Sequence, residues 1–174
     1  MDNLRGYLQI YTGNGKGKTT AAIGLTIRAL GAGWKIFFGQ FLKKGEYSEL
    51  KVLKGFGSQV LIQQFGTGCF VRGKPSSQDY QAAQRGWEAC SKALLSGEFQ
   101  LCVFDELNLA LHFKLLNLEE VLARLAARPA HVEVVVTGRY APLELLEAAD
   151  LVTEMREIKH YYRQGVKARL GIEK

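Results

Sequence analysis

Short apolar runs alternate along the chain with longer stretches in which apolar residues recur at helical spacing. This alternation is typical of a parallel sheet whose strands are connected by helices. The apolar runs predict strands over residues 8–12, 34–41, 59–65, 101–104 and 132–137, with an edge strand over 151–153.

The stretches of helical periodicity predict helices between these strands. Gly31 and Gly33 end the first of them. Ser76 or Ser77 caps the second, and Pro129 follows the third. The predicted helices cover residues 18–30, 76–96, 118–127 and 143–149. The fold class is therefore α/β, a three-layer, open and mostly parallel sheet flanked by helices, which binds its ligands at the carboxyl ends of the strands.

Size and composition narrow the class of protein further. The 174 residues suit one domain over 1–174, and no repeat or Pro/Ser-rich linker divides them. Apolar residues make up 47% and charged residues 23%, which excludes disordered, collagen-like and low-complexity chains. The 23 Lys and Arg exceed the 17 Asp and Glu by six, so the net charge is +6. This excess favours an anionic partner, either nucleotide, phosphate, nucleic acid or acidic lipid, without choosing among them.

The cysteines and the amino-terminal sequence bear on the compartment. Cys69, Cys90 and Cys102 are too few and too far apart for a zinc knuckle or a redox pair, which suggests a reducing environment. The first residues hold no apolar stretch long enough for a signal peptide, and no run approaches a membrane span. We therefore expect a cytoplasmic protein without a membrane partner.

A glycine-rich run follows the first predicted strand and precedes the first predicted helix, as a phosphate-binding P-loop requires. Gly13, Gly15 and Gly17 permit backbone N–H groups to converge on phosphate oxygens, because no Cβ stands in the way. The helix that follows directs its positive end at the same place. Lys18 supplies a cation for the terminal phosphates, and the Thr19 hydroxyl is suited to ligate Mg²⁺.

Two residues depart from the general P-loop pattern. Thr12 stands where the pattern has its first glycine, and Lys16 adds a second cation to a short loop. The alternative interpretation is a glycine-rich turn that caps an ordinary helix. The agreement of strand, loop, Lys-Thr pair and helix favours the P-loop, and with it the P-loop NTPase (RecA-like) class.

The predicted strand over residues 101–104 ends in two carboxylates, Asp105 and Glu106. An apolar strand that ends in this way is the pattern that holds Mg²⁺ opposite a P-loop. Asp105 is suited to bind the metal directly or through water, and Glu106 to bind metal or to orient a nucleophile. In the alternative interpretation, Asp105 caps a helix that begins near Leu107 and Glu106 is solvated.

Later segments add candidate ligand contacts. Arg139 follows the strand over 132–137 and should emerge on the ligand side of the sheet, in reach of a phosphate; the alternative is a surface arginine after a turn. Cys69 and Phe70, in a glycine-rich stretch, either line a pocket or anchor a loop. The pattern assigns no element from residue 156 onward, where the basic residues are either solvated or in contact with ligand; they include Lys159, His160, Lys167 and Arg169.

Several of these motifs together resemble the P-loop type of corrinoid adenosyltransferase, the ATP:cob(I)alamin adenosyltransferases. The similarity runs over residues 6–173, and a P-loop without its first glycine is characteristic of that family. The motifs are TGNGKGKTTAAIG, Gln40-Phe41 after the second strand, FDELN, LEEVLARLAARP, VVVTGR, ADLVTEMR and IKHYYRQGVKARLGIE.

The resemblance implies transfer of the 5′-deoxyadenosyl group from ATP to the cobalt of a reduced corrinoid, in adenosylcobalamin synthesis or salvage. The acceptor is cob(I)alamin or cob(I)yrinic acid a,c-diamide. Cob(I) attacks the 5′ carbon of the ribose, so the whole triphosphate leaves as one unit. Lys16, Lys18, the backbone amides and Mg²⁺ would stabilise the charge that develops on it. The implied partners are ATP, the corrinoid, an electron-donating protein and a second copy of the chain, with no nucleic acid.

The motifs and the resemblance together assign the site. Catalysis falls to Lys18, Lys16 and Arg139, and the metal to Thr19, Glu106 and Asp105. In familiar members a Phe and then a Trp follow the Thr-Gly of a loop that here reads Cys69-Phe70-Val71-Arg72, so Phe70 is expected to cover the corrin face. The other nucleotide and corrinoid contacts are expected at Gly13, Asn14, Gly15, Lys16, Gly17, Lys18, Thr19, Thr20, Arg28 and Lys159.

Three other functions use the same P-loop. A P-loop ATPase or kinase would cleave the γ-phosphate and yield orthophosphate or ADP. A nucleic-acid-linked ATPase would bind with an affinity that falls steeply with salt, although the positive charges are spread over loops and tail without a nucleic-acid module. A regulatory nucleotide sensor would bind ATP without chemistry.

Overall fold

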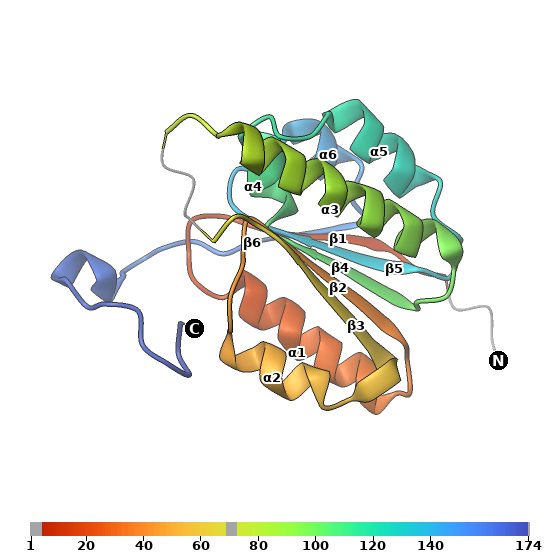
Figure 1. The fold of residues 1–174 in the computed structure, drawn as a ribbon, viewed down its shortest axis with the longest axis horizontal. Helices are drawn as coiled ribbons and strands as arrows, with labels where there is room; N and C mark the ends of the chain where they lie inside the picture. Colours follow the sequence, from red (N-terminus) through yellow and green to blue (C-terminus); the bar gives the residue numbers. More distant parts are fainter. Residues whose placement is uncertain (1–4, 69–72, 174) are drawn as a thin grey trace.

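The computed structural model describes residues 5–68 and 73–173. In these residues one parallel sheet has the strand order β3-β2-β4-β5-β1-β6 (Figure 1). Because all paired strands are parallel, their carboxyl ends meet at one edge of the sheet. The strands are β1 (Leu8–Thr12), β2 (Ile36–Phe41), β3 (Val60–Phe65), β4 (Leu101–Asp105), β5 (Glu133–Thr137) and β6 (Leu151–Glu154).

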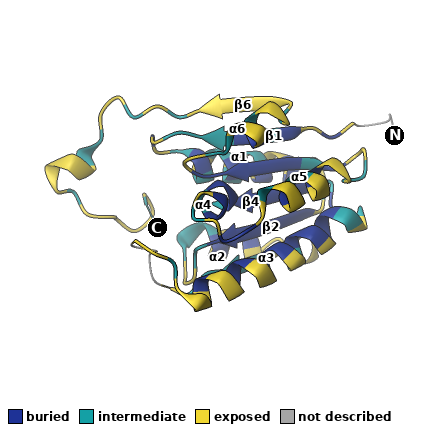
Figure 2. Cartoon of the chain, turned by 90° about the horizontal axis from the view of Figure 1, so that it is seen from above, coloured by how far each residue is buried: buried dark blue, intermediate teal, exposed yellow. Residues whose placement is uncertain are grey.

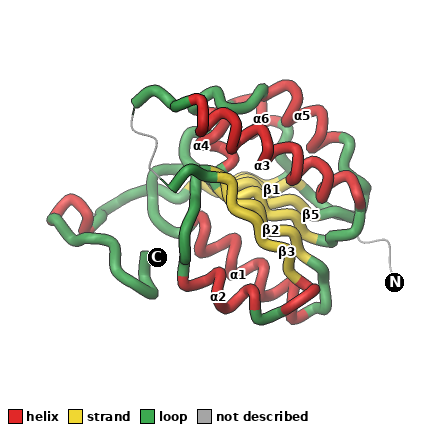
Figure 3. Tube along the Cα trace, viewed as in Figure 1, coloured by secondary structure: helices red, strands yellow, loops and turns green. Residues whose placement is uncertain are grey.

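Helices cover both faces of the sheet, as Figures 1 and 3 show. One face carries α1 (Lys18–Gly31) and α2 (Ser48–Lys54). The other carries α3 (Ser77–Ser96), α4 (Leu107–His112), α5 (Leu118–Ala126) and α6 (Leu143–Glu147). The three-layer α/β prediction is confirmed, and the sheet of the described residues is parallel throughout.

The strands separate two apolar layers because successive side chains point to opposite faces. In β5, Val134 and Val136 pack into the layer under α3, whereas Val135 packs into the layer under α1. Cys90 and Cys102 are fully buried in the first layer, where they act as small apolar side chains. Figure 2 shows the buried central strands beside the exposed edge strand β6.

The structure differs from the predicted elements at short segments. The sequence did not predict α2 and gave α4 only in the alternative interpretation, as a helix that begins near Leu107, because each is only about two turns long and shows no clear period. In α2 the buried residues are Leu50 and Leu53 alone. Strand β2 begins at Ile36, two residues later than expected.

Beyond β6 the chain leaves the body of the fold, forms the 3-10 helix η2 (Tyr161–Gln164) and turns back toward the carboxyl edge (Figure 1). We call residues 155–173 the tail. A second 3-10 helix, η1 (Gly57–Gln59), precedes β3. Among the described residues, no helix has the length and apolar character needed to cross a membrane.

Candidate active site

The glycine-rich loop that the sequence predicts to be a P-loop, and for which we keep that name, connects β1 to α1 at the carboxyl edge of the sheet, in the predicted place. Gly13 (φ 95°) and Gly17 (φ 121°) adopt positive φ, which glycine does without steric cost. A Cβ on Gly13 or Gly15 would lie only 2.5 or 2.6 Å from the carbonyl oxygen of Met155. The Gly15 N–H donates to that same oxygen at 2.6 Å, so the first residue of the tail packs directly on the loop.

The two lysines of the loop make different contacts. Lys18 Nζ donates to the carbonyl oxygens of Gly13 at 2.8 Å and Gly15 at 2.7 Å, which holds the ammonium within the loop. Burial lowers the pKa of Lys18 below its ordinary value. Lys16 Nζ instead donates to the Ile172 carbonyl oxygen at 2.8 Å, and thereby ties the P-loop to the end of the tail.

Four polar side chains form a row across the carboxyl edge, and we call Gln64, Gln40, Asp105 and Thr137 the polar row. Gln64 Nε2 donates to Gln40 Oε1 at 3.0 Å, and Gln40 Nε2 donates to Asp105 Oδ2 at 3.1 Å. Thr137 Oγ1 donates to Asp105 Oδ1 at 2.6 Å. The strand register produces the row, because Gln64 of β3 and Asp105 of β4 are both paired with Gln40 of β2.

Asp105 is the fully buried centre of the site. Besides the polar row, Thr19 Oγ1 donates to its Oδ1 at 2.8 Å and Lys43 Nζ donates to its Oδ2 at 2.7 Å. Burial by itself would raise the pKa of Asp105, but the Lys43 charge and the hydroxyls of Thr137 and Thr19 lower it below its ordinary value. Thr19 and Asp105, the residues predicted to share a metal, are therefore in direct contact, and the lowered pKa favours the ionised form of the Asp105 carboxylate.

Glu106 follows Asp105 in a left-handed backbone conformation, with φ 61°, and is the N-cap residue immediately before α4. Its N–H donates to Thr137 Oγ1 at 3.1 Å, which fixes it beside the polar row. Burial and the neighbouring charge of Asp105 raise the pKa of Glu106. The alternative in which Asp105 caps a helix is wrong, since α4 begins after Glu106 and Asp105 makes none of the helix-capping contacts.

Sequence reasoning missed Lys43, which lies just after β2. Its Nζ bonds to Asp105 and stands 3.2 Å from Thr19 Oγ1. Burial alone would lower the pKa of Lys43, but Asp105 and Glu106 outweigh it and raise the pKa. One signal was available: Gln40 is a polar residue in a fully buried strand, and Lys43 follows it at the edge where such sheets bind ligands.

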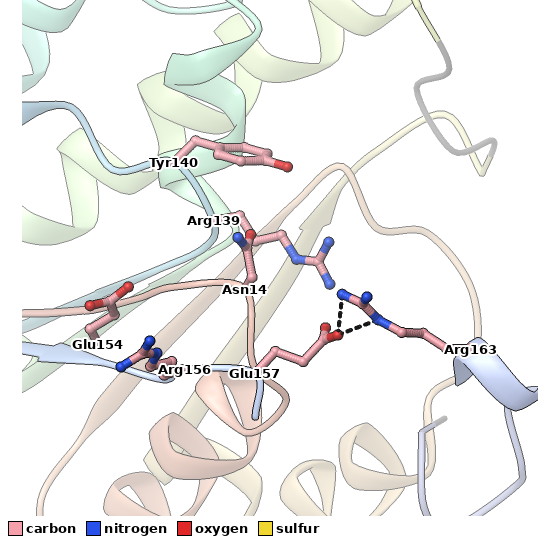
Figure 4. Close-up of a pocket in the computed structure, with 7 residues that line it drawn as sticks. All are labelled: Asn14, Arg139, Tyr140, Glu154, Arg156, Glu157 and Arg163. Atoms are coloured by element: carbon pink, nitrogen blue, oxygen red, sulfur yellow. Dashed lines mark hydrogen bonds and ion pairs between the residues drawn. The ribbon is translucent and has the colours of Figure 1, made fainter. Parts of the chain in front are cut away.

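Arg139 emerges on the ligand side of the sheet, as expected. Gly138, with φ 133°, packs so closely on α4 that a Cβ would lie 2.9 Å from Asn108 Cβ, and this tight turn directs Arg139 toward the P-loop. Figure 4 shows Arg139 and Arg163 reaching into one cavity of about 320 Å³, where Arg163 Nη2 pairs with Glu157 at 2.7 Å. The residues that line it are Asn14, Arg139, Tyr140, Glu154, Arg156, Glu157 and Arg163.

Lys159 lies in a second cleft, of about 360 Å³, which it shares with Gly15 and Lys16. The tail forms the other wall of this cleft, including His160 and Tyr161. The structure therefore brings the basic tail to the P-loop, although these residues are about 140 positions apart in the sequence.

One family of known proteins matches this chain. The family model of the ATP:corrinoid adenosyltransferases BtuR/CobO/CobP matches residues 4–173, nearly the whole chain. The chain belongs to this family.

Its relatives include a corrinoid adenosyltransferase of Pseudomonas aeruginosa, 40% identical over 97% of this chain and 84% of the relative. The corrinoid adenosyltransferase CobA of Salmonella typhimurium is 38% identical over 97% of this chain and 86% of the relative. In fold alone, the chain is similar to the flagellar accessory protein FlaH of Methanocaldococcus jannaschii. That likeness has a TM-score of 0.56 at 13% identity, over 87% of this chain and 71% of FlaH.

Some residues expected in the site of this adenosyltransferase family member are not brought to the P-loop. Arg28 lies in the last turn of α1, and ten residues of helix place it about 15 Å along the axis from Lys18. Arg169, for which solvation and ligand contact were both open, pairs with Glu173 Oε1 at 3.2 Å, and that same oxygen lies 3.4 Å from Lys16 Nζ, so Arg169 reaches the P-loop through Glu173. Phe70, expected to cover the corrin face, and Cys69, expected either to line a pocket or to anchor a loop, lie outside the described residues.

Proposed function

We propose that this chain transfers the 5′-deoxyadenosyl group of ATP to the cobalt of a reduced corrinoid and releases intact triphosphate. One observation carries the proposal. In a chain of the adenosyltransferase family, Thr19 of the P-loop donates to the fully buried Asp105 at 2.8 Å, within a site that also holds Lys18. This is the arrangement that binds a nucleotide triphosphate with its metal.

The reaction requires that the negative charge on the leaving triphosphate be stabilised. As the cobalt–carbon bond forms, the bond between the 5′ carbon and oxygen breaks, and the triphosphate takes the electron pair. Lys18 and Lys16 of the loop, with Arg139 from the end of β5, are the cations that would bind this charge. Preorganised cations at the leaving group stabilise the transition state more than the ground state, because the charge increases as the bond breaks.

The residues present fit Mg²⁺. Thr19, Asp105 and Glu106 offer oxygen donors, and the ammonium of Lys43 already lies between the first two as a stand-in cation. Mg²⁺ beside a nucleotide is held by one or two carboxylates, waters and phosphate oxygens, so a few protein ligands suffice. When bound, the ion would neutralise charge on the triphosphate.

The proposal also covers the corrinoid acceptor and the partners of the protein. The acceptor would be cob(I)alamin or the a,c-diamide precursor, and a separate electron-donating protein would supply the reduced cobalt. A cytoplasmic location, a homodimeric assembly and the absence of nucleic acid from the reaction stay predictions. Sedimentation equilibrium tests the assembly, where a single species at the monomer mass would contradict it.

Product analysis tests the chemistry. The protein is mixed without oxygen with Mg²⁺, ATP and chemically reduced cobalamin or the a,c-diamide. We expect the absorption spectrum of the adenosylated corrinoid and one triphosphate for each adenosyl group transferred. Orthophosphate or ADP as product, with no adenosylated corrinoid, would instead identify a γ-phosphate-cleaving ATPase or kinase. Stimulation of that cleavage by DNA or RNA would identify the nucleic-acid-linked form.

A further inference from the structure

Lys43 occupies the space between Thr19 and Asp105, two of the three residues to which the metal is assigned. Its Nζ is 2.7 Å from Asp105 Oδ2 and 3.2 Å from Thr19 Oγ1. A Mg²⁺ ion that took both side chains as ligands would stand about 2.1 Å from an oxygen of each. An ammonium and such an ion cannot share this space, so one must leave when the other enters.

The backbone around Lys43 is built to bring the side chain back over the sheet edge. Leu42 adopts φ 56°, a left-handed conformation that is unusual for a bulky residue, and its N–H donates to Phe65 O at 3.1 Å. A Cβ on Gly66 would lie 2.6 Å from Lys43 N, so the chain after β3 packs directly on the Lys43 backbone. Strain of this kind persists where the surrounding structure enforces it, and is concentrated at functional sites.

The Lys43 ammonium has an alternative contact that it can make when it leaves Asp105. The side chain of Lys43 is 18% exposed, so it is open on one side although Asp105 is fully buried. The ring of Tyr47 lies with its centroid 5.6 Å from Nζ, within the range of a cation–π contact. A lysine stem is flexible, and a small rotation would exchange the carboxylate for the aromatic face.

We propose that Lys43 is a placeholder cation for the metal site. It holds Thr19 and Asp105 in place while the protein is free of nucleotide, and it leaves this position when Mg²⁺ enters with ATP. The proposal rests on the proposed function, because it takes Thr19 and Asp105 as the metal ligands. Lys43 is thus a positioning residue, which acts on the reaction through the metal.

The exchange of Lys43 for Mg²⁺ makes the site selective for the Mg²⁺–nucleotide complex over the free ion. Free Mg²⁺ would have to displace the Lys43 ammonium from the buried Asp105 carboxylate and would gain only the protein ligands. The Mg²⁺–ATP complex also brings phosphate oxygens and their contacts with the P-loop lysines. The site therefore stays closed to the free ion and opens to the complex.

Metal binding without nucleotide tests the idea. Mn²⁺ serves as the probe, and the signal of free Mn²⁺ in electron paramagnetic resonance gives the dissociation constant. Replacing Lys43 by methionine removes the competing cation, and we expect Mn²⁺ to bind at least about tenfold more tightly than to the wild type, because a unit charge close to the ion is removed. Lys43→Arg keeps a cation and should show no gain.

Lys44→Met is the matched control, since Lys44 is the exposed neighbour and the change in net charge is the same. We expect it to bind Mn²⁺ as the wild type does. Equal affinities for wild type and Lys43→Met, or an equal gain in both methionine variants, would overturn the proposal. If Lys43→Met is unfolded, Lys43→Gln carries the test, because its amide can still donate to Asp105. If both are unfolded, recovery of the circular dichroism spectrum on addition of Mn²⁺ is expected, and no recovery would contradict the placeholder role.

A parallel measurement separates this proposal from the one on which it rests. Wild-type protein should bind Mn²⁺ in the presence of ATP. If it does not, the metal assignment of the proposed function is wrong. If it does, while Lys43→Met gains no affinity for free Mn²⁺, the metal site stands and only the placeholder role fails.

Discussion

Asp105 shows how a single buried charge depends on residues from all over the chain. It accepts hydrogen bonds from Thr19, Gln40, Lys43 and Thr137, which belong to α1, β2, the loop after β2 and β5. A buried carboxylate without such partners would be strongly destabilising, so these contacts are needed for folding as well as for binding. The sequence predicted that Asp105 and Thr19 would meet at a metal, because each carries a local motif. It did not predict the other three partners, whose roles depend on strand register.

Lys18 is the P-loop cation that we expect to bind the departing triphosphate. Lys18→Ala should leave the fold intact and lower kcat/KM for adenosyl transfer by at least about 10²-fold, because a preorganised cation at the leaving group is lost. The measurement is adenosylated corrinoid formed from ATP and pre-reduced cobalamin, with circular dichroism as the check on folding.

Lys35→Ala is the matched control for this variant. Lys35 precedes β2, at the amino end of the strand, and its only described ion pair is with Glu98 at 3.6 Å. We expect its turnover to equal that of the wild type. Retained turnover in Lys18→Ala would remove the P-loop from the mechanism.

At the scale of elements, α3 begins where the sequence placed it. Ser76, one of two predicted caps, accepts from Asp79 N at 3.2 Å, and the Asp79 carboxylate accepts from Ser76 N at 2.9 Å. Thr67 Oγ1 also donates to Asp79 at 2.9 Å, which joins the start of α3 to the chain after β3. Capping could be predicted because it involves residues three apart, whereas the contact with Thr67 could not.

The capping box predicts a pH dependence of stability. Hydrogen bonds from Ser76 lower the pKa of Asp79, so the folded protein favours the ionised form more than the unfolded chain does. The resulting stabilisation is present above the ordinary Asp pKa of about 3.9 and is lost as the pH falls through the lowered value. Asp79→Ala should therefore reduce the free energy of unfolding by about 1 kcal/mol at pH 7, and by less at pH 3.

Urea unfolding at pH 7, 5 and 3 measures this effect. Glu88→Ala is the control, because Glu88 is exposed on the same helix. Its cost should be small and should not follow the pH dependence of Asp79→Ala. A difference between wild type and Asp79→Ala that stayed constant down to pH 3 would show that the carboxylate charge has no part in the cap.

At the scale of the whole molecule, the tail joins the carboxyl edge at both of its ends. Met155 O accepts from Gly15 N, and near the other end Lys16 Nζ donates to Ile172 O and lies 3.4 Å from Glu173 Oε1. Between these contacts the tail leaves large apolar side chains exposed, with Ile158 at 83% and Leu170 at 78%. Few buried contacts hold it, so local opening of the tail requires little free energy.

Limited proteolysis tests this arrangement. Trypsin should cleave first in the tail, which contains Arg156, Lys159, Arg163, Lys167 and Arg169. Mg²⁺ with ATP should slow that cleavage, because the triphosphate would bind in the cleft between P-loop and tail and a ligand stabilises the form that binds it. Mass spectrometry identifies the first sites. Lys18→Ala should show no protection, and first cleavage inside the sheet or helices would contradict the weak attachment of the tail.

The sequence alone predicted the glycine-rich loop between β1 and α1, the succession of strands and longer helices along the chain, and the acidic end of β4. Each of these features depends on residues that lie close together along the chain: a glycine pattern, an apolar period, or a strand followed by carboxylates. The tertiary structure alone decided the polar row, the place of Lys43 and the contact of the tail with Gly15 and Lys16. Those features depend on which strands pair, in which register, and on how closely two backbones approach, as at Gly66. Such long-range choices are made by packing of the whole chain and leave no mark in its local pattern.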